Sequence, residues 1–100
     1  MLIHLEKEMD FKKEISEGVI LVDFFASWCG PCKMLTPELE EFSAKNPDIK
    51  VVKVNIDDFG QLASEYNVRV VPTLFVFKDG KEVKTSSGFM DAGALENFVK

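Results

Sequence analysis

Apolar residues occur in two nearly continuous runs along this chain. The first is Val19–Phe25. The second is Val51–Ile56, interrupted only by Lys53 and Asn55. Runs of this length without strict alternation are typical of strands that are buried on both faces, as in a parallel sheet covered by helices. We therefore predict two central strands at these positions.

Between these two runs, apolar side chains recur at helical spacing, at Cys32, Leu35, Leu39 and Phe42. This spacing directs one apolar stripe of a helix toward the core. Strand, helix and strand in this order form a right-handed crossover. Pro37 lies inside the predicted helix and removes one backbone hydrogen bond, so we expect a kink near it.

Turn and capping residues indicate the other elements. Asp79-Gly80 has a strong preference for a hairpin turn, so we expect the sheet to end antiparallel. The other predicted strands are an edge strand at Leu2–Glu6 and the two hairpin strands at Thr73–Lys78 and Glu82–Ser87. A first helix, capped by Asp10, carries Phe11 and Ile15 and ends near Gly18, and a last helix, capped by Asp91, carries Leu95, Phe98 and Val99. A helix between them contains Phe59, Leu62, Ala63 and Tyr66 and is closed by Asn67. The predicted order is β-α-β-α-β-α-β-β-α.

The composition indicates one globular domain over residues 1–100. Hydrophobic residues make up 46% of the chain and charged residues 29%, which excludes a disordered chain. The net charge of −5 and the lack of a basic cluster argue against a nucleic-acid partner. No apolar stretch is long enough for a membrane span, and the segment Met1–Glu6 does not resemble a secretion signal. We therefore expect a cytoplasmic monomer that does not contact a membrane.

Both cysteines lie in the segment Trp28-Cys29-Gly30-Pro31-Cys32, between the first central strand and the helix. The first turn of a helix has unpaired N–H groups and partial positive charge, which favour a thiolate. Pro31 suits this first turn, and Gly30 lets the backbone approach closely. We therefore predict that Cys29 is the nucleophile and that Cys32 is the resolving thiol of a reversible disulfide.

Three other interpretations of the cysteine pair are weaker. A zinc site needs about four ligands, whereas the chain offers two cysteines and the distant His4. A purely structural disulfide across so short a loop would constrain the unfolded chain little. A papain-like nucleophile needs a histidine as base, and His4 is more typical of an ordinary strand residue.

Two charged residues interrupt the apolar strands, Asp23 in the first and Lys53 in the second. Charge in such a position is costly unless it is paired or used. One interpretation is a structural ion pair between the two side chains. The other is that burial raises the pKa of Asp23, so that its carboxyl moves a proton to or from Cys32, through water.

The chain resembles the thioredoxin family over nearly its whole length. The matching residues are Val22-Asp23-Phe24, Ala26, Trp28-Cys29-Gly30-Pro31-Cys32-Lys33, Pro37, Lys53-Val54-Asn55-Ile56-Asp57, Val71-Pro72-Thr73, Asp79-Gly80 and Gly88. The resemblance implies an α/β fold with three α/β/α layers, in which four helices flank a central mixed sheet of five strands. It also implies a protein-disulfide reductase that needs no cofactor, acts on disulfide-containing proteins and is itself reduced by a thioredoxin reductase.

The resemblance also implies roles for residues around the dithiol. It favours proton transfer by Asp23, beside Lys53, and it implies a cis bond before Pro72, where the backbone of Val71 pairs with an extended substrate. The expected docking surface consists of Trp28, Gly30, Pro31, Val71, Pro72 and Gly88. Trp28 as a core residue and Gly88 as a simple turn residue are the alternatives. Phe25 and Phe89-Met90 depart from the family pattern, and the second departure could reshape the partner surface.

Two other functions remain to be distinguished from a reductase. One is a binding subunit that uses the thioredoxin surface regardless of its redox state. Full biological activity of a Cys29/Cys32 double serine variant would favour it. The other is an oxidant or isomerase of similar fold, against which the intervening Gly30-Pro31 argues.

Overall fold

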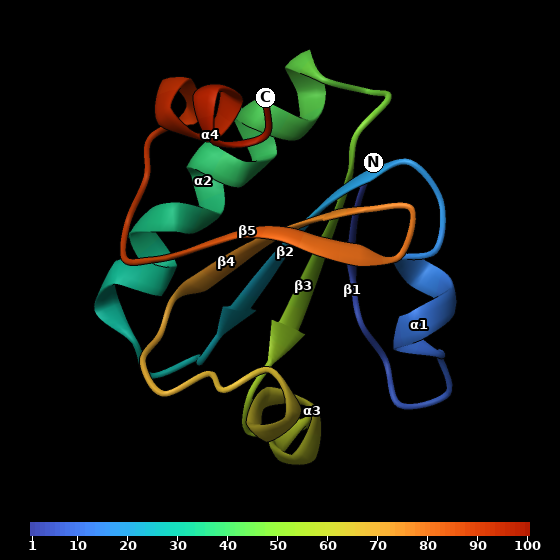
Figure 1. Cartoon of the computed structure of the whole chain (residues 1–100). Helices are drawn as coiled ribbons and strands as arrows, with labels where there is room; N and C mark the ends of the chain where they lie inside the picture. Colours follow the sequence, from blue (N-terminus) through green and yellow to red (C-terminus); the bar gives the residue numbers. More distant parts are fainter.

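The computed structural model describes residues 1–100 and has the predicted order of elements (Figure 1). The strands are β1 (Leu2–His4), β2 (Val19–Phe25), β3 (Lys50–Asn55), β4 (Thr73–Lys78) and β5 (Lys81–Ser87). The helices are α1 (Phe11–Glu14), α2 (Gly30–Lys45), α3 (Gly60–Glu65) and α4 (Ala92–Phe98). No helix is long and apolar enough to cross a membrane.

The five strands form one mixed sheet in the order β1-β3-β2-β4-β5. Strand β3 is parallel to both β1 and β2, whereas β4 is antiparallel to β2 and β5 is antiparallel to β4. The predicted hairpin is confirmed, since Asp79 and Gly80 both have positive φ angles of 50° and 86° between β4 and β5. Such angles are typical of the tight turn that matches the twist of two paired strands.

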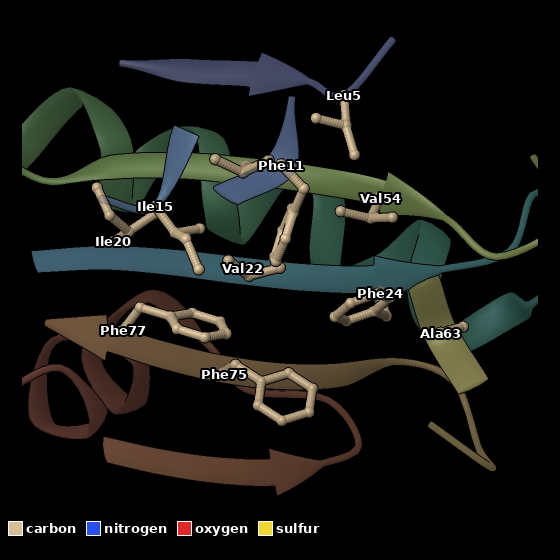
Figure 2. Packing of buried hydrophobic residues seen from close by; sticks show 11 residues of the cluster. Leu5, Phe11, Ile15, Ile20, Val22, Phe24, Val54, Ala63, Phe75 and Phe77 are labelled. Carbon is tan, nitrogen blue, oxygen red and sulfur yellow. The ribbon is translucent and has the colours of Figure 1, made fainter. Parts of the chain in front are cut away.

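The two faces of the sheet have separate cores, because successive side chains of a strand point to opposite faces. Val22 and Phe24 of β2 belong to the cluster that also contains Phe11 of α1 and Ala63 of α3 (Figure 2). Leu21 belongs to the other cluster, which contains side chains of α2 and α4 such as Leu35, Leu39, Phe42 and Leu95. The molecule therefore has three layers. Each fully buried Leu or Phe contributes about 1.5–3 kcal/mol to this core.

Most predicted caps and boundaries are confirmed. The side chains of Asp10 and Asp91 accept hydrogen bonds from the backbone N–H groups of Lys12 and Ala94 at the starts of α1 and α4. Helix α2 continues through Pro37. Asn67 follows α3 with a positive φ of 57°, which ends that segment as predicted.

Two predicted boundaries are wrong by more than one residue. Strand β1 ends at His4 instead of Glu6, because its ladder with β3 ends at Lys53. Helix α1 ends at Glu14 instead of near Gly18, because Ser16 donates its hydroxyl hydrogen to the carbonyl of Lys13 and the chain then bends toward β2. The predicted third helix is wrong by one residue at each end, since Phe59 and Tyr66 are the caps of α3 and not part of it.

Candidate functional site

The two cysteines lie at the N-terminus of α2, where β2 leads into the helix. Cys29 is the N-cap residue, and its Sγ accepts a hydrogen bond of 3.2 Å from the backbone N–H of Cys32. The two residues form a disulfide, with their Cα atoms 5.3 Å apart. Both are buried, Cys32 at 3% exposure and Cys29 at 6%. An N–H group directed at the Cys29 sulfur stabilises a thiolate there once the disulfide is reduced.

Gly30 and Pro31 form the exposed first turn of α2. Proline at this position leaves no intrahelical hydrogen bond unmade, because the first N–H groups of a helix have no partner within it. The space around Gly30 is open, since no atom lies within 4 Å of a Cβ placed there. The first turn of α2 therefore leaves the surface beside the disulfide open to a partner.

The loop before β4 lies directly against the disulfide, although it is 42 residues away in sequence. The carbonyl oxygen of Val71 is 3.6 Å from Cys29 Sγ. The Val71-Pro72 peptide bond is cis, as the resemblance implies. Val71 makes no backbone hydrogen bond, whereas Pro72 is buried and its carbonyl accepts the N–H of Gly88 at 2.9 Å. Val71 therefore presents a free peptide group beside the sulfur.

Gly88 holds the end of β5 beside Pro72. Its φ is 97°, a conformation that side chains rarely adopt, and nothing lies within 4 Å of a Cβ placed there. The glycine is therefore required by the backbone conformation, and the space above it is open to a partner. Both interpretations of Gly88, turn residue and open approach, agree with this geometry.

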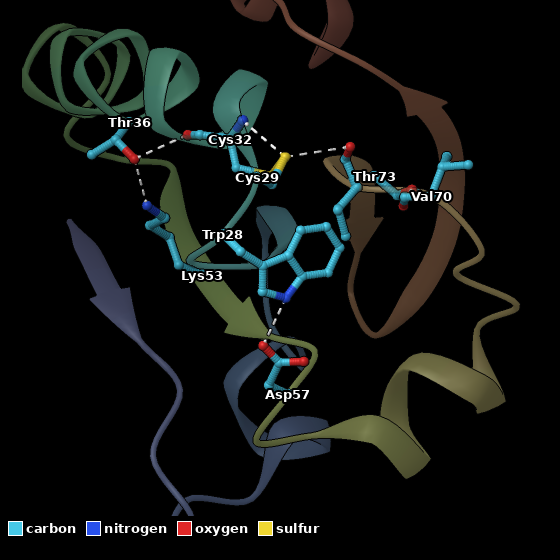
Figure 3. The surroundings of a disulfide bond; sticks show 9 residues. Trp28, Cys29, Cys32, Thr36, Lys53, Asp57, Val70 and Thr73 are labelled. Carbon is cyan, nitrogen blue, oxygen red and sulfur yellow. Dashed lines mark hydrogen bonds between the residues drawn. A yellow bond between two sulfur atoms is a disulfide. The ribbon is translucent and has the colours of Figure 1, made fainter.

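Trp28 is a surface residue and not a core residue, with 67% of its area exposed. Its Nε1 donates a hydrogen bond of 3.1 Å to Asp57 Oδ2, which holds the indole against the end of β3 (Figure 3). A groove of about 320 Å³ lies beside the ring. The other residues that line this groove are Ile56, Val68, Arg69, Val70 and Val71. An exposed aromatic ring next to an apolar groove is typical of a contact surface.

Asp23 is fully buried on the face of the sheet that α2 covers. Neither of its carboxyl oxygens has a hydrogen-bond partner. Burial raises the pKa of the Asp23 carboxyl from 3.8 to about 7, against a smaller opposing effect of the Lys53 charge. The cause is desolvation, which disfavours the charged carboxylate. A carboxyl with such a pKa can accept or release a proton at neutral pH.

Lys53 lies opposite Asp23 in the paired strands β2 and β3, but the two side chains do not form a salt bridge. Its Nζ instead donates a hydrogen bond of 2.9 Å to Thr36 Oγ1 and lies 4.6 Å from the centre of the Phe25 ring. The interpretation of Asp23 and Lys53 as a direct structural ion pair is therefore wrong. The ammonium is bound to α2 instead.

Sequence reasoning missed two residues of this site, Thr36 and Asp57. Thr36 is four residues after Cys32, so its place one helical turn away could have been read from the spacing. Asp57 lies two residues after the end of the strand that carries Lys53, but nothing in the sequence pairs it with Trp28. Of the two departures from the family pattern, Phe25 contacts Lys53, and Phe89 is 45% exposed.

One cleft of the surface lies away from the cysteines. It has a volume of about 620 Å³ and is lined by residues of the segments 5–11 and 58–65. No group of three or more His, Cys, Asp or Glu side chains is placed to hold a metal ion. His4 lies in β1, with its ring edge-on to Phe25. The reactive groups of the molecule are therefore gathered around the disulfide and not in this cleft.

Comparisons with known proteins agree with this geometry. Residues 2–100 match the family model described as Thioredoxin. Over 98 residues the chain is 46% identical to a thioredoxin of Chlamydia trachomatis, covering 98% of this chain and 96% of that protein. It is also 46% identical over 100 residues to a thioredoxin of Bacillus subtilis, covering 99% and 96%. The crystal structure of a thioredoxin from Nicotiana alata aligns with a TM-score of 0.87 at 34% identity, covering 96% of this chain and 87% of that one.

Proposed function

The chain belongs to the thioredoxin family and is a thiol–disulfide oxidoreductase, and from this premise we propose that Cys29 attacks the substrate and Cys32 resolves the product. The observation that carries this assignment is the position of Cys29 as the N-cap of α2, with the Cys32 N–H directed at its sulfur. Cys32 lies inside the first turn of α2, is more buried than Cys29 and is bonded to it. The helix terminus therefore activates the first thiol and shields the second.

The proposed reaction transfers two electrons in two exchange steps. The Cys29 thiolate attacks one sulfur of the substrate disulfide, forms a mixed disulfide and releases the other substrate sulfur as a thiolate that takes a proton from water. The Cys32 thiolate then attacks the Cys29 sulfur and releases the second substrate thiolate. The Cys29–Cys32 disulfide of this structure is the state that results. A thioredoxin reductase returns the two electrons, and no bound cofactor takes part.

Asp23 is proposed to accept the proton that Cys32 loses before the second step. Asp23 and Lys53 lie on the same face of the sheet, and α2, which carries Cys32, covers this face. Its raised pKa of about 7 matches the range in which a general base works at neutral pH. Both thiols must lose a proton in each cycle. We propose that the proton of Cys32 passes to Asp23 through water.

The proposed docking surface surrounds the disulfide. Its members are Trp28, Gly30, Pro31, Val71, Pro72 and Gly88. The free peptide group of Val71 is suited to pair with an extended substrate segment, a contact that reads little sequence. Pro72 is buried, so its part is to hold Val71 in place and not to offer its own surface. Disulfide-containing proteins of varied sequence are therefore the proposed substrates.

We also propose that residues 1–100 work as one domain, as a monomer and in the cytoplasm. The only two cysteines form the redox pair, and a close pair of this kind is typical of catalysis in a reducing compartment. The docking surface must be free for substrates, which favours a monomer. Size-exclusion chromatography at several concentrations tests the oligomeric state.

Trapping of the mixed disulfide tests the assignment of the two cysteines. Cys32→Ser should accumulate a covalent complex with a disulfide substrate, because attack occurs and resolution does not. Cys29→Ser should give neither complex nor turnover. The matched control is the double serine variant. A complex that forms with Cys29→Ser and not with Cys32→Ser would reverse the two roles.

A further inference from the structure

The Lys53 ammonium is held away from its nearest buried counter-charge. Lys53 and Asp23 oppose each other in the parallel pair of β3 and β2, so their side chains share one face of the sheet. Both are buried, at 4% and 0% exposure. A buried ammonium and a buried carboxylate on opposing residues of two paired strands would normally form an ion pair. Here the ammonium is bound by Thr36 and Phe25, and the carboxyl oxygens have no partner.

The hydroxyl of Thr36 is oriented for this contact by its own helix. Thr36 donates its hydroxyl hydrogen to the carbonyl of Cys32, one turn earlier in α2, over 3.2 Å. A hydroxyl that has donated its one hydrogen retains only acceptor capacity, and an ammonium is only a donor. The Thr36 oxygen is therefore set to accept from Lys53 Nζ (Figure 3). The chain of contacts runs from the backbone of Cys32 through Thr36 to Lys53.

We propose that Thr36 is a positioning residue, which holds the Lys53 ammonium on α2 and thereby keeps the Asp23 carboxyl free to take the proton of Cys32 at neutral pH. This inference rests on the proposed role of Asp23. Thr36 touches neither substrate nor sulfur, so it acts through Lys53. The Phe25 ring assists, because an ammonium over an aromatic face is attracted to it.

Few other groups act on Asp23. Strand β4 places the apolar Leu74 opposite Asp23, and β1 places His4 opposite Lys53, with its ring edge-on to Phe25. The Cys29 and Cys32 sulfurs at the start of α2 do not titrate as a disulfide. Lys53 is the one residue whose charge opposes the rise in the pKa of Asp23 caused by burial. A shift of the ammonium toward or away from Asp23 therefore changes the proton affinity of this carboxyl directly.

Loss of the Thr36 hydroxyl should move Lys53. Thr36→Val keeps the shape of the side chain and removes the acceptor. The ammonium would then be buried without a hydrogen bond, which is costly, and the Asp23 carboxylate is the acceptor that can replace it. The variant should therefore form the ion pair that the parent lacks.

The carboxyl titration of Asp23, followed by ¹³C NMR on the oxidised protein without substrate, tests this proposal. Thr36→Val should shift the titration midpoint down by roughly 1 pH unit, the size typical of a newly formed contact with an opposite charge. Thr36→Ser retains the hydroxyl and should titrate like the parent. An unchanged midpoint in Thr36→Val, or the same shift in Thr36→Ser, overturns the proposal. If Thr36→Val does not fold, Thr36→Ala takes its place.

A second background shows whether Thr36 acts through Lys53. In Lys53→Met, the addition of Thr36→Val should leave the Asp23 midpoint where Lys53→Met alone puts it. A shift of equal size in this background also overturns the proposal. The trapping experiment with Cys32→Ser is independent of the titration, so failure of the proposed function and failure of this inference are distinguishable.

Discussion

The sulfur of Cys29 lies 3.6 Å from the carbonyl oxygen of Val71, so the reactive atom and a free peptide group face the same point of the surface. Val71 makes no backbone hydrogen bond. A substrate strand that pairs with this peptide group would carry its own disulfide to the Cys29 sulfur. One contact would then both bind and orient the substrate.

A disulfide peptide that is N-methylated next to its cysteine should bind more weakly than the unmodified peptide. The methyl group removes the hydrogen that would be donated to the Val71 carbonyl, and one such bond contributes about 1 kcal/mol. We therefore expect KM to rise about fivefold with little change in kcat. Methylation several residues further along the peptide is the matched control. Equal KM values for all three peptides would show that the Val71 backbone does not bind substrate.

Asp57→Ala should loosen Trp28 without unfolding the protein. The indole is 67% exposed, so its hydrogen bond to Asp57 contributes little to stability, about 1 kcal/mol or less. Trp28 is the only tryptophan, so fluorescence anisotropy reports on this ring alone. We expect lower anisotropy and a higher KM for protein disulfides. Asp57→Asn retains an acceptor oxygen and should behave like the parent, and anisotropy that does not fall in Asp57→Ala would contradict the role given to this contact.

Cys29 should react with iodoacetamide at a lower pH than a free cysteine does. The N-terminus of α2 and the Cys32 N–H favour its thiolate over the neutral thiol. The measurement is the alkylation rate of the reduced protein against pH, with Cys32→Ser used to isolate Cys29. The pKa of a free thiol is about 8.5, and a Cys29 profile with this midpoint would rule out activation by the helix terminus.

Asp23→Ala should gain stability over the parent as pH rises from about 4 to about 7. Burial raises the folded-state pKa of Asp23 from 3.8 to about 7, so the native state keeps the proton longer than the unfolded state does. The free energy of unfolding of the parent therefore falls across this window, by an amount on the order of 4 kcal/mol, and the variant is free of this loss. Urea unfolding of the oxidised proteins at a series of pH values measures the difference.

The control for this measurement is Val76→Ala, a truncation in the cluster on the same face of the sheet. It removes buried methyl groups but no titrating group, so its cost should be the same at every pH. Asp23→Ala also leaves a small cavity, which shifts its whole curve and not its slope. A difference between Asp23→Ala and the parent that stays constant with pH would mean that Asp23 titrates alike in the folded and unfolded states.

The sequence by itself determined several features that depend on neighbouring residues. The apolar runs predicted β2 and β3, Asp79-Gly80 predicted the hairpin, and the segment around the cysteines predicted that Cys29 lies at the start of a helix. Each of these follows from backbone geometry within a few residues, where spacing and residue type are sufficient. Asp23 and Lys53 were also conspicuous, because charge within an apolar strand is costly wherever it lies.

Only the tertiary structure decided which distant groups meet. Val71 reaches Cys29 from 42 residues away, which the family resemblance implied and residue spacing did not, and Asp57 reaches Trp28 from 29 residues away. The pairing of β2 with β3 places Lys53 opposite Asp23, yet the packing of α2 on the sheet gives the ammonium to Thr36. A buried ammonium takes the acceptor that the packed side chains bring nearest, and the linear order of residues does not contain that distance. The lack of a hydrogen-bond or ion-pair partner for the Asp23 carboxyl therefore follows from the fold alone.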